Sequence, residues 1–363
     1  MKILTIYNFM KTIILTIFTA ILLTFTGCVQ APTDNTENPA AKKNDGKIVI
    51  GFSMDTLKEH WVKDRELVEQ YAKEMGAEVI VNVANSNDDL QLKQVDNFLT
   101  QGVDVLIIAP HNGQVMATAV ERAKKQGVPV VAYDRLIKSD DVDVVVSHLH
   151  SLAGEMQAKY ALEKAPNGNY IMIYGASTDN NAQIMEKSQK ETLKSATDSG
   201  KVKIVAEQNA TNWSPEEALK IAENALTQNS NNVVAIIASN DGMAGGAIQA
   251  LNNQGLKGKV VVTGMDAQID ALQRIASGEQ SMTVYKPIQP LAKAAVEAAV
   301  KLAKGEKPET SKTMMADKKE IPFIFIEPKV VEKGNLIDVI NDGYAEYDEV
   351  FRNIPENERP KKN

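Results

Sequence analysis

Planar polar side chains and both tryptophans follow the apolar runs of this chain, at the points where strands are expected to end. Carboxylate, amide and guanidinium groups form directional hydrogen bonds with hydroxyl groups, which both donate and accept. The flat face of an indole packs against the C–H face of a pyranose ring. This combination of residue types indicates a cleft that binds a sugar. The candidate ligand-binding residues are His60, Trp61, Asp134, Arg135, Asp179, Asn181, Trp213, Asn240, Asp266 and Lys286.

Each type of candidate also has an alternative role that needs no ligand. A tryptophan at the start of a helix can anchor the packing of that helix. Adjacent Asp134 and Arg135 can form a surface ion pair, and Asn240 can cap the helix that follows it. Lys286 can be solvated. The sugar-site hypothesis therefore depends on the joint placement of the candidates at successive strand ends.

The hydropathy pattern predicts the elements that must position these residues. Short apolar runs alternate with amphipathic segments, which is typical of β-α-β units around a buried parallel sheet. Ligands of such sheets bind at the carboxyl ends of the strands. The expected strands are 48–52, 78–83, 103–108, 128–133, 170–174, 202–206, 233–238, 260–263 and 321–326, and the expected helices include 61–75, 90–101, 114–126, 182–198, 215–228, 243–253 and 290–304.

The repetition of these units occurs twice along the chain, which predicts an α/β protein with two doubly wound parallel-sheet lobes. Residues 47–147 plus 286–318 are expected to form the N-terminal lobe. Residues 148–285 plus 319–345 are expected to form the C-terminal lobe.

Three crossings between the lobes follow from this division, near residues 145–149, 283–286 and 318–321. Several crossings make a hinge that opens and closes without rotating freely. The tail, residues 346–363, is expected to be loose.

The N-terminus has the pattern of an export signal. Two lysines precede an uncharged apolar run, residues 12–26, and Gly27 stands directly before Cys28, the only cysteine of the chain. This order predicts a lipoprotein signal peptide, residues 1–27, whose removal leaves Cys28 as a lipidated N-terminus on the cell membrane. Residues 28–46 are poor in large apolar side chains and are expected to be a flexible tether. The body of the protein would then lie outside the cytoplasm.

Two alternatives for the N-terminus are also considered. Met10, followed by Lys11, is a second possible start, because a signal that begins there has the same basic and apolar order. The apolar run could instead be a transmembrane anchor, although it is shorter than the roughly 20 residues that span a bilayer.

Composition excludes several classes of function. Loss of residues 1–27 removes two lysines and no acidic residue, which takes the formal net charge from −7 to −9. An acidic body argues against nucleic-acid binding, which needs a basic face. With no cysteine left after Cys28, disulfides and thiolate metal sites are excluded. The chain has no nucleophile elbow and no glycine-rich phosphate loop. We therefore expect no enzyme, no cofactor and no metal.

Several segments match a known family as whole motifs. They are WVKDR (61–65), GVDVL (102–106), PHNGQV (110–115), AYDR (132–135), DNNA (179–182), ASND (238–241), AGGAIQAL (244–251) and MTVYKP (282–287). With these segments the chain resembles the periplasmic sugar-binding proteins of the ribose and galactose type, and most closely the D-xylose-binding proteins of ABC importers. The resemblance spans residues 47 to about 340 and implies a type I periplasmic binding protein fold.

The resemblance also implies a sugar site between the two lobes. It assigns the oxygens of the sugar to Asp134, Arg135, Asn181, Asn240, Asp266 and Lys286. It places Trp61 and Trp213 on the two faces of the sugar ring, and Asp179 is a weaker candidate.

The function implied by the resemblance is that of a lipid-anchored receptor. Such a receptor captures D-xylose between two closing lobes and delivers it to an ABC permease. Its partners would be the monosaccharide, the permease subunits and the membrane, through the lipid on Cys28. The alternative is a sensor subunit that docks on a membrane histidine kinase.

Two departures from the family pattern involve histidines. His60 stands where the relatives carry arginine, and an imidazole has fewer donors and titrates near neutrality. His148 and His150 stand in the segment that enters the second lobe, where relatives often have acidic or amide residues. Two residues apart, they would share one face of a strand. With no evident third ligand, they are expected to be strand histidines, partly buried or exposed.

Overall fold

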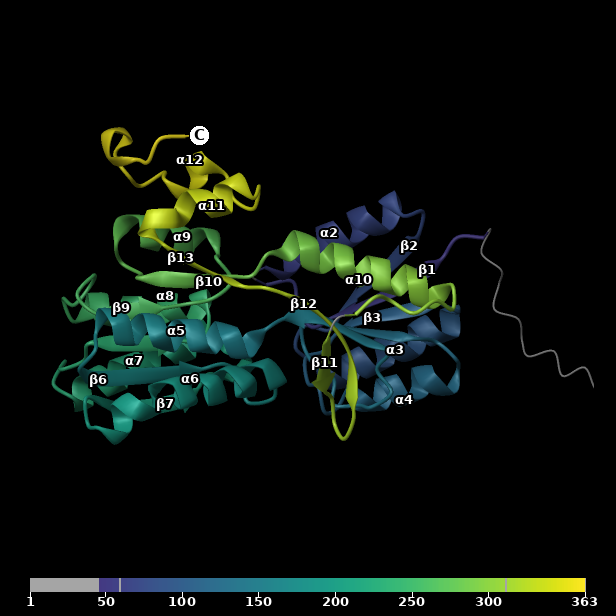
Figure 1. Ribbon diagram of the computed structural model, residues 1–363, viewed down its shortest axis with the longest axis horizontal. Helices are drawn as coiled ribbons and strands as arrows, with labels where there is room; N and C mark the ends of the chain where they lie inside the picture. Colours follow the sequence, from purple (N-terminus) through teal and green to yellow (C-terminus); the bar gives the residue numbers. More distant parts are fainter. Residues whose placement is uncertain (1–45, 59, 311, 363) are drawn as a thin grey trace, which may run out of the picture. The chain divides into compact units, whose positions relative to one another are not determined.

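The computed structural model describes residues 46–58, 60–310 and 312–362. The predicted signal peptide, Cys28 and all but the last residue of the predicted tether lie outside the described residues. Within the described ranges, no helix has both the length and the hydropathy needed to cross a membrane. Two mainly parallel sheets and the helices that cover them form the framework of this part of the chain (Figure 1).

In the described residues, the first sheet has seven strands in the order β11-β12-β5-β4-β3-β1-β2. β11 pairs antiparallel with β12, and all other neighbours are parallel. Aliphatic runs such as β3 are buried along their whole length, as a parallel sheet with two covered faces requires. The strands are β1 (Val49–Met54), β2 (Glu78–Val83), β3 (Val105–Ala109), β4 (Val130–Tyr133), β5 (Val144–His148), β11 (Lys312–Met315) and β12 (Glu320–Ile326).

Alternate residues of this sheet face two separate cores. Ile50 and Phe52 of β1 pack with helices α2 (Trp61–Glu74) and α10 (Ile288–Ala303). Leu106 and Ile108 of β3 pack on the other face with α3 (Asp88–Gln101) and α4 (Ala117–Lys125). Figure 1 shows α2 and α10 together on one side of the sheet and α3 and α4 on the other. We call these elements the first lobe.

The second lobe is built around a four-stranded parallel sheet, in the order β7-β6-β8-β9 within the described chain. α7 and α8 pack on one face of this sheet, and α5 and α6 pack on the other. The elements are β6 (Gly168–Tyr174), β7 (Val202–Asn209), β8 (Ala235–Ala238), β9 (Val261–Thr263), α5 (His150–Lys164), α6 (Asn180–Asp198), α7 (Pro215–Gln228) and α8 (Asp241–Asn253).

A smaller unit completes the second lobe. β10 (Met282–Tyr285) pairs antiparallel with β13 (Lys329–Glu332). Their buried side chains share a core with α9 (Ile269–Ser277) and α11 (Leu336–Asn341). The isolated bridge between Met265 and Val284 joins this unit to the end of β9.

The chain crosses between the lobes three times in the described residues: after β5, after β10 and after β12. The first two crossings lie near the predicted positions, but the third prediction, near residues 318–321, is wrong. β12 extends the first sheet, with Phe323 opposite Val145, so residues 319–326 belong to the first lobe. The third crossing therefore falls at residues 327–328. An isolated apolar strand fits either sheet, and only its long-range pairing with β5 decides between them.

The prediction of a loose tail over residues 346–363 is also wrong for its first part. Tyr347–Val350 forms the short helix α12, and Val350 and Phe351 are buried against α9. The hydroxyl of Tyr347 donates a hydrogen bond to the carbonyl of Pro360, 2.5 Å away. These aromatic and aliphatic side chains pack against α9. The charged residues that follow them in the chain are unsuited to such burial.

Candidate functional site

All ten candidate residues line one cavity with a volume of about 750 Å³. The cavity lies at the carboxyl ends of the strands, because the residues that follow β1, β4, β6, β8 and β9 all face it. This is the position that an open α/β sheet gives to a ligand. The geometry brings the candidates together, and their roles toward a ligand stay predictions. Other lining residues are Asp55, Lys58, Asn85, His111 and His150.

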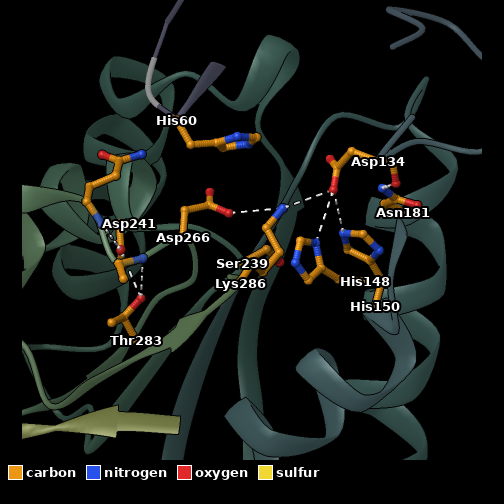
Figure 2. A network of polar contacts seen from close by, with 12 residues as sticks. His60, Asp134, His148, His150, Asn181, Ser239, Asp241, Asp266, Thr283 and Lys286 are labelled. Atoms are coloured by element: carbon orange, nitrogen blue, oxygen red, sulfur yellow. Dashed lines mark hydrogen bonds and ion pairs between the residues drawn. The ribbon is translucent and has the colours of Figure 1, made fainter. Parts of the chain in front are cut away.

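Lys286, at the second crossing, is the centre of the buried charges in this cavity. Its ammonium lies 3.1 Å from the Oδ1 atom of Asp266 and 3.5 Å from the Oδ1 atom of Asp134 (Figure 2). Burial opposes the charge of Asp134, but Lys286 holds the pKa of that carboxyl well below its usual range. Burial likewise opposes the charge of Lys286, and the two carboxylates raise its pKa above the ordinary value. Asp134 and Lys286 are therefore both charged at neutral pH.

A network behind Asp266 fixes its unusual backbone. Asp266 has a φ of 101° and Ala267 a φ of 53°, which an L-residue adopts only when its surroundings enforce it. The Asp241 carboxylate accepts hydrogen bonds from the backbone nitrogen of Gln268 and from the hydroxyl of Thr283, at 3.0 and 2.8 Å. The Thr283 hydroxyl also accepts from the nitrogen of Ala267, at 3.2 Å. Figure 2 shows Asp241 and Thr283 of this network beside Asp266.

Arg135 connects the two lobes with its guanidinium. Nη1 donates to the Oδ2 atom of Asp55 at 2.7 Å and to the carbonyl of Pro110 at 3.1 Å, both in the first lobe. Nε lies 2.8 Å from the Oδ2 atom of Asp179 in the second lobe. The guanidinium carbon also lies 5.2 Å from the centre of the Trp61 ring, within the range of a cation–π contact. These contacts hold Arg135 in a single place.

Asp179 lines the cavity, but protein groups occupy both of its oxygens. Oδ1 accepts from the backbone nitrogen of Asn181 at 2.9 Å, which makes Asp179 the N-cap of α6. Oδ2 accepts from the indole Nε1 of Trp213 at 3.3 Å and pairs with Arg135. Burial raises the pKa of Asp179, although Arg135 acts in the opposite direction. The geometry makes Asp179 an anchor for Trp213 and Arg135.

The two tryptophans differ in their surroundings. Trp61 is buried in the first core, so the packing role considered from the sequence holds for it while its edge lines the cavity. Trp213 is half-buried at the end of a short 3-10 turn, Thr211–Trp213, with a φ of 57°. Its ring lies against Gly175, where a Cβ atom would come within 2.3 Å of it. Trp213 is therefore the indole with more surface free for a ligand.

Asn181 and Asn240 both contact protein groups in addition to lining the cavity. The amide of Asn181 donates to the carbonyl of Asp134 across the lobes, at 2.9 Å. The Oδ1 atom of Asn240 accepts from the backbone nitrogen of Met243 at 2.9 Å and caps α8. The capping role considered for Asn240 is thus present together with its place in the cavity wall.

His60 belongs to a buried chain of hydrogen bonds. Its Nδ1 atom lies 2.6 Å from the Oδ2 atom of Asp64, whose other oxygen accepts from the hydroxyl of Tyr133. Its ring lies against that of Trp61 in a tilted arrangement, with centroids 4.5 Å apart. Burial lowers the pKa of His60, but Asp64 outweighs burial and raises it above the ordinary value.

His148 and His150 are placed differently from the prediction. His148 ends β5 and His150 begins α5, so they do not share a strand face, and both are buried. The Nδ1 atom of His148 lies 3.5 Å and the Nε2 atom of His150 lies 4.0 Å from the Oδ1 atom of Asp134. Burial lowers the pKa of both imidazoles, to about 3 for His150. The described residues contain no group of three or more His, Cys, Asp or Glu side chains that could hold a metal ion.

Asp55 and His111 are cavity residues that the candidate set omitted. The Nδ1 atom of His111 lies 3.0 Å from the Oδ1 atom of Asp55. The Oδ2 atom of Asp55 pairs with Arg135. Burial opposes the charge of Asp55, but these two partners lower its pKa to about 2. Asp55 directly follows β1, and His111 lies two residues after the end of β3, so the search for polar residues after strands that selected the other candidates could have found them.

The fold and the cavity together are those of a two-lobed binding protein whose candidate ligand site lies at the strand ends of both sheets. The model of the periplasmic binding protein domain matches residues 50–307. The D-xylose-binding periplasmic protein of Escherichia coli (strain K12) is 44% identical over 342 residues, which cover 94% of this chain and 99% of that protein. The protein of the same name from Haemophilus influenzae is 45% identical over 304 residues, 83% of this chain and 92% of that protein. This chain therefore belongs to the periplasmic binding protein family.

Solved structures of this type agree with the assignment. The carbohydrate transporter solute binding protein from Chloroflexus aurantiacus, in complex with D-glucose, has a TM-score of 0.79 and 29% identity, and the match covers 84% of this chain and 98% of that chain. The Caulobacter myo-inositol binding protein has a TM-score of 0.74 and 26% identity, with 83% and 99% covered. The predicted type I fold is confirmed, and so is the prediction that the chain is a binding protein and no enzyme. The family also places it outside the cytoplasm.

We expect Asp55→Asn to lower the pKa of His111 toward its ordinary value of about 6.5. The hydrogen bond to Asp55 raises the pKa of His111 in the folded protein, against a smaller effect of burial. The stabilisation from protonated His111 is therefore fully present below about pH 6.5 and is lost as the pH rises through the folded pKa. NMR titration of the imidazole signals measures this directly, since the chain has only four histidines.

His60 is the internal control for this titration. Its pKa is raised by Asp64, so Asp55→Asn should leave it unchanged. An ordinary pKa for His111 in the wild-type protein would show that the contact with Asp55 does not form in solution.

Proposed function

We propose that this protein captures D-xylose between its two lobes and delivers it to an ABC permease. The observation that carries the proposal is the convergence of all ten candidate residues on one cavity of about 750 Å³. The relatives named for D-xylose binding, whose matches cover 94% and 83% of the chain, support the choice of sugar.

The cavity offers each polar edge of a pyranose a partner of suitable chemistry. Asp134 and Asp266 present carboxylate oxygens that accept from hydroxyl groups, and Lys286 and Arg135 present donors. Because these charges are buried, their hydrogen bonds to a hydroxyl are stronger than the same bonds in water. Trp213 supplies a flat apolar surface for the C–H face of the ring.

The contacts between the lobes explain why the sugar would favour closure. Arg135 pairs with a carboxylate from each lobe, and Lys286 does the same. A sugar that contacts these groups binds both lobes at once, which it can do only when they are together. Its differential affinity for that arrangement shifts the population toward it.

Calorimetric titration of the purified protein with D-xylose, D-ribose, L-arabinose and D-glucose tests the proposed function. We expect one-to-one binding with D-xylose as the tightest ligand. Preferential binding of another sugar would overturn the choice of xylose, and binding of none of them would overturn the sugar site itself.

Trp213→Ala is expected to weaken D-xylose binding by about 1–3 kcal/mol, because it removes the exposed stacking surface. Trp213→Phe is the matched control, since it keeps a flat ring and should recover most of the affinity. Trp61 is unsuitable for this test because it is buried in the first core. Equal affinity for Trp213→Ala and the wild type would make Trp213 a packing residue only.

We further propose that a lipid on Cys28 attaches the protein to the cell membrane. The support is the order of basic residues, apolar run, glycine and cysteine at the N-terminus. We expect Cys28→Ala to move the protein from the membrane fraction to the soluble fraction, and mass spectrometry of the wild type to show an acylated Cys28. An unmodified Cys28 in the mature wild-type protein would refute the anchor.

A further inference from the structure

His150 is a buried polar residue in the cavity wall that has no assigned role. It is the first residue of α5, its side chain is 4% exposed, and it lines the cavity. Within the described chain, neither ring nitrogen makes a hydrogen bond, and the Nε2 atom lies 4.0 Å from the Oδ1 atom of Asp134. Figure 2 shows the His150 ring turned toward Asp134.

His148 gives a comparison within the same segment. Its Nε2 atom lies 3.2 Å from the carbonyl of Pro287, so it joins the first crossing to the second. His150 has no such contact, and its ring meets that of His148 only edge-on, with centroids 6.4 Å apart. Packing alone could be satisfied by an apolar side chain. The Nδ1 atom of His148 is fully buried without a hydrogen-bond partner, whereas neither ring nitrogen of His150 is enclosed in this way. Because His150 lines the cavity, its ring nitrogens are open to a partner that the cavity could supply.

The separation from Asp134 suits one bridging oxygen. A distance of 4.0 Å is too long for a direct hydrogen bond, but a single oxygen can lie within hydrogen-bond distance of both atoms. A hydroxyl group fits this position because it accepts one hydrogen bond and donates another. Burial, aided by the charge of Lys286, lowers the pKa of His150 to about 3, so the ring is neutral and has one donor and one acceptor.

We propose that His150 is a further ligand-binding residue, and that its Nε2 atom and the Oδ1 atom of Asp134 share one hydroxyl group of the sugar. The hydroxyl accepts from Nε2–H and donates to the carboxylate. This inference rests on the proposed function, since it assigns a contact within the same sugar site. It makes His150 a residue that distinguishes sugars by the presence of a hydroxyl at one ring position.

The test pairs variants of His150 with a series of altered sugars. D-Xylose and its monodeoxy analogues are titrated calorimetrically into the wild type, His150→Leu and His150→Gln. Leucine removes both ring nitrogens at similar volume, whereas glutamine returns a donor near the Nε2 position. Ser188→Ala is the matched structural control, because it removes a 2.6 Å hydrogen bond to the carbonyl of Ser151 without touching the cavity.

We expect one deoxy analogue to bind the wild type roughly 10- to 100-fold more weakly than D-xylose through this contact. His150→Leu should bind D-xylose more weakly and should lose most of its discrimination against that analogue. His150→Gln should recover part of both, and Ser188→Ala should keep the wild-type pattern. A merely structural role for His150 would weaken all the sugars alike.

The outcomes separate the two proposals. Failure of the wild type to bind D-xylose overturns the proposed function. Binding by the wild type, with the same affinities and deoxy pattern in His150→Leu, overturns the role of His150 alone. If His150→Leu does not fold, the wild type labelled with ¹⁵N-histidine still decides. D-Xylose should shift the Nε2 resonance of His150, and no difference among the deoxy analogues in that shift would overturn the shared hydroxyl.

Discussion

The buried ammonium of Lys286 is the interaction on which the arrangement of this site depends. It stands at a crossing between the lobes and contacts Asp134 of the first lobe and Asp266 of the second. A buried charge is tolerated only when partners replace its water, so the position of each lobe is tied to this single cation. The same cation helps to keep the neighbouring His148 and His150 neutral, because a second positive charge beside it is unfavourable.

Arg135 repeats this arrangement on the other side of the cavity, with Asp55 from the first lobe and Asp179 from the second. The cavity is therefore lined by ions that already have partners. A neutral sugar does not need to neutralise them, and it gains from their oriented dipoles and donors. This explains how a site rich in charge can serve an uncharged ligand.

Much of the fold was predictable because runs such as 103–108 are apolar on both faces, which only a covered parallel sheet accommodates. The site candidates followed from their positions after those runs. The incorrect predictions concerned features that depend on the tertiary structure. The lobe assignment of β12 depends on its pairing with β5, which is distant in sequence. His150 lies near Asp134 because β5 ends at His148 and α5 begins at His150. Asp55 directly follows β1, so the same positional argument could have included it.

Two of the three crossings contain a proline, Pro287 and Pro328. The pyrrolidine ring fixes the backbone φ, which is −61° at Pro287, and His148 further joins that crossing to the first. In the closure proposed above, these restraints would limit how far the connection can twist. The two walls of the cavity would then meet in a similar alignment at each closure, so part of the fidelity of recognition would come from the connection as well as from the residues that face the ligand.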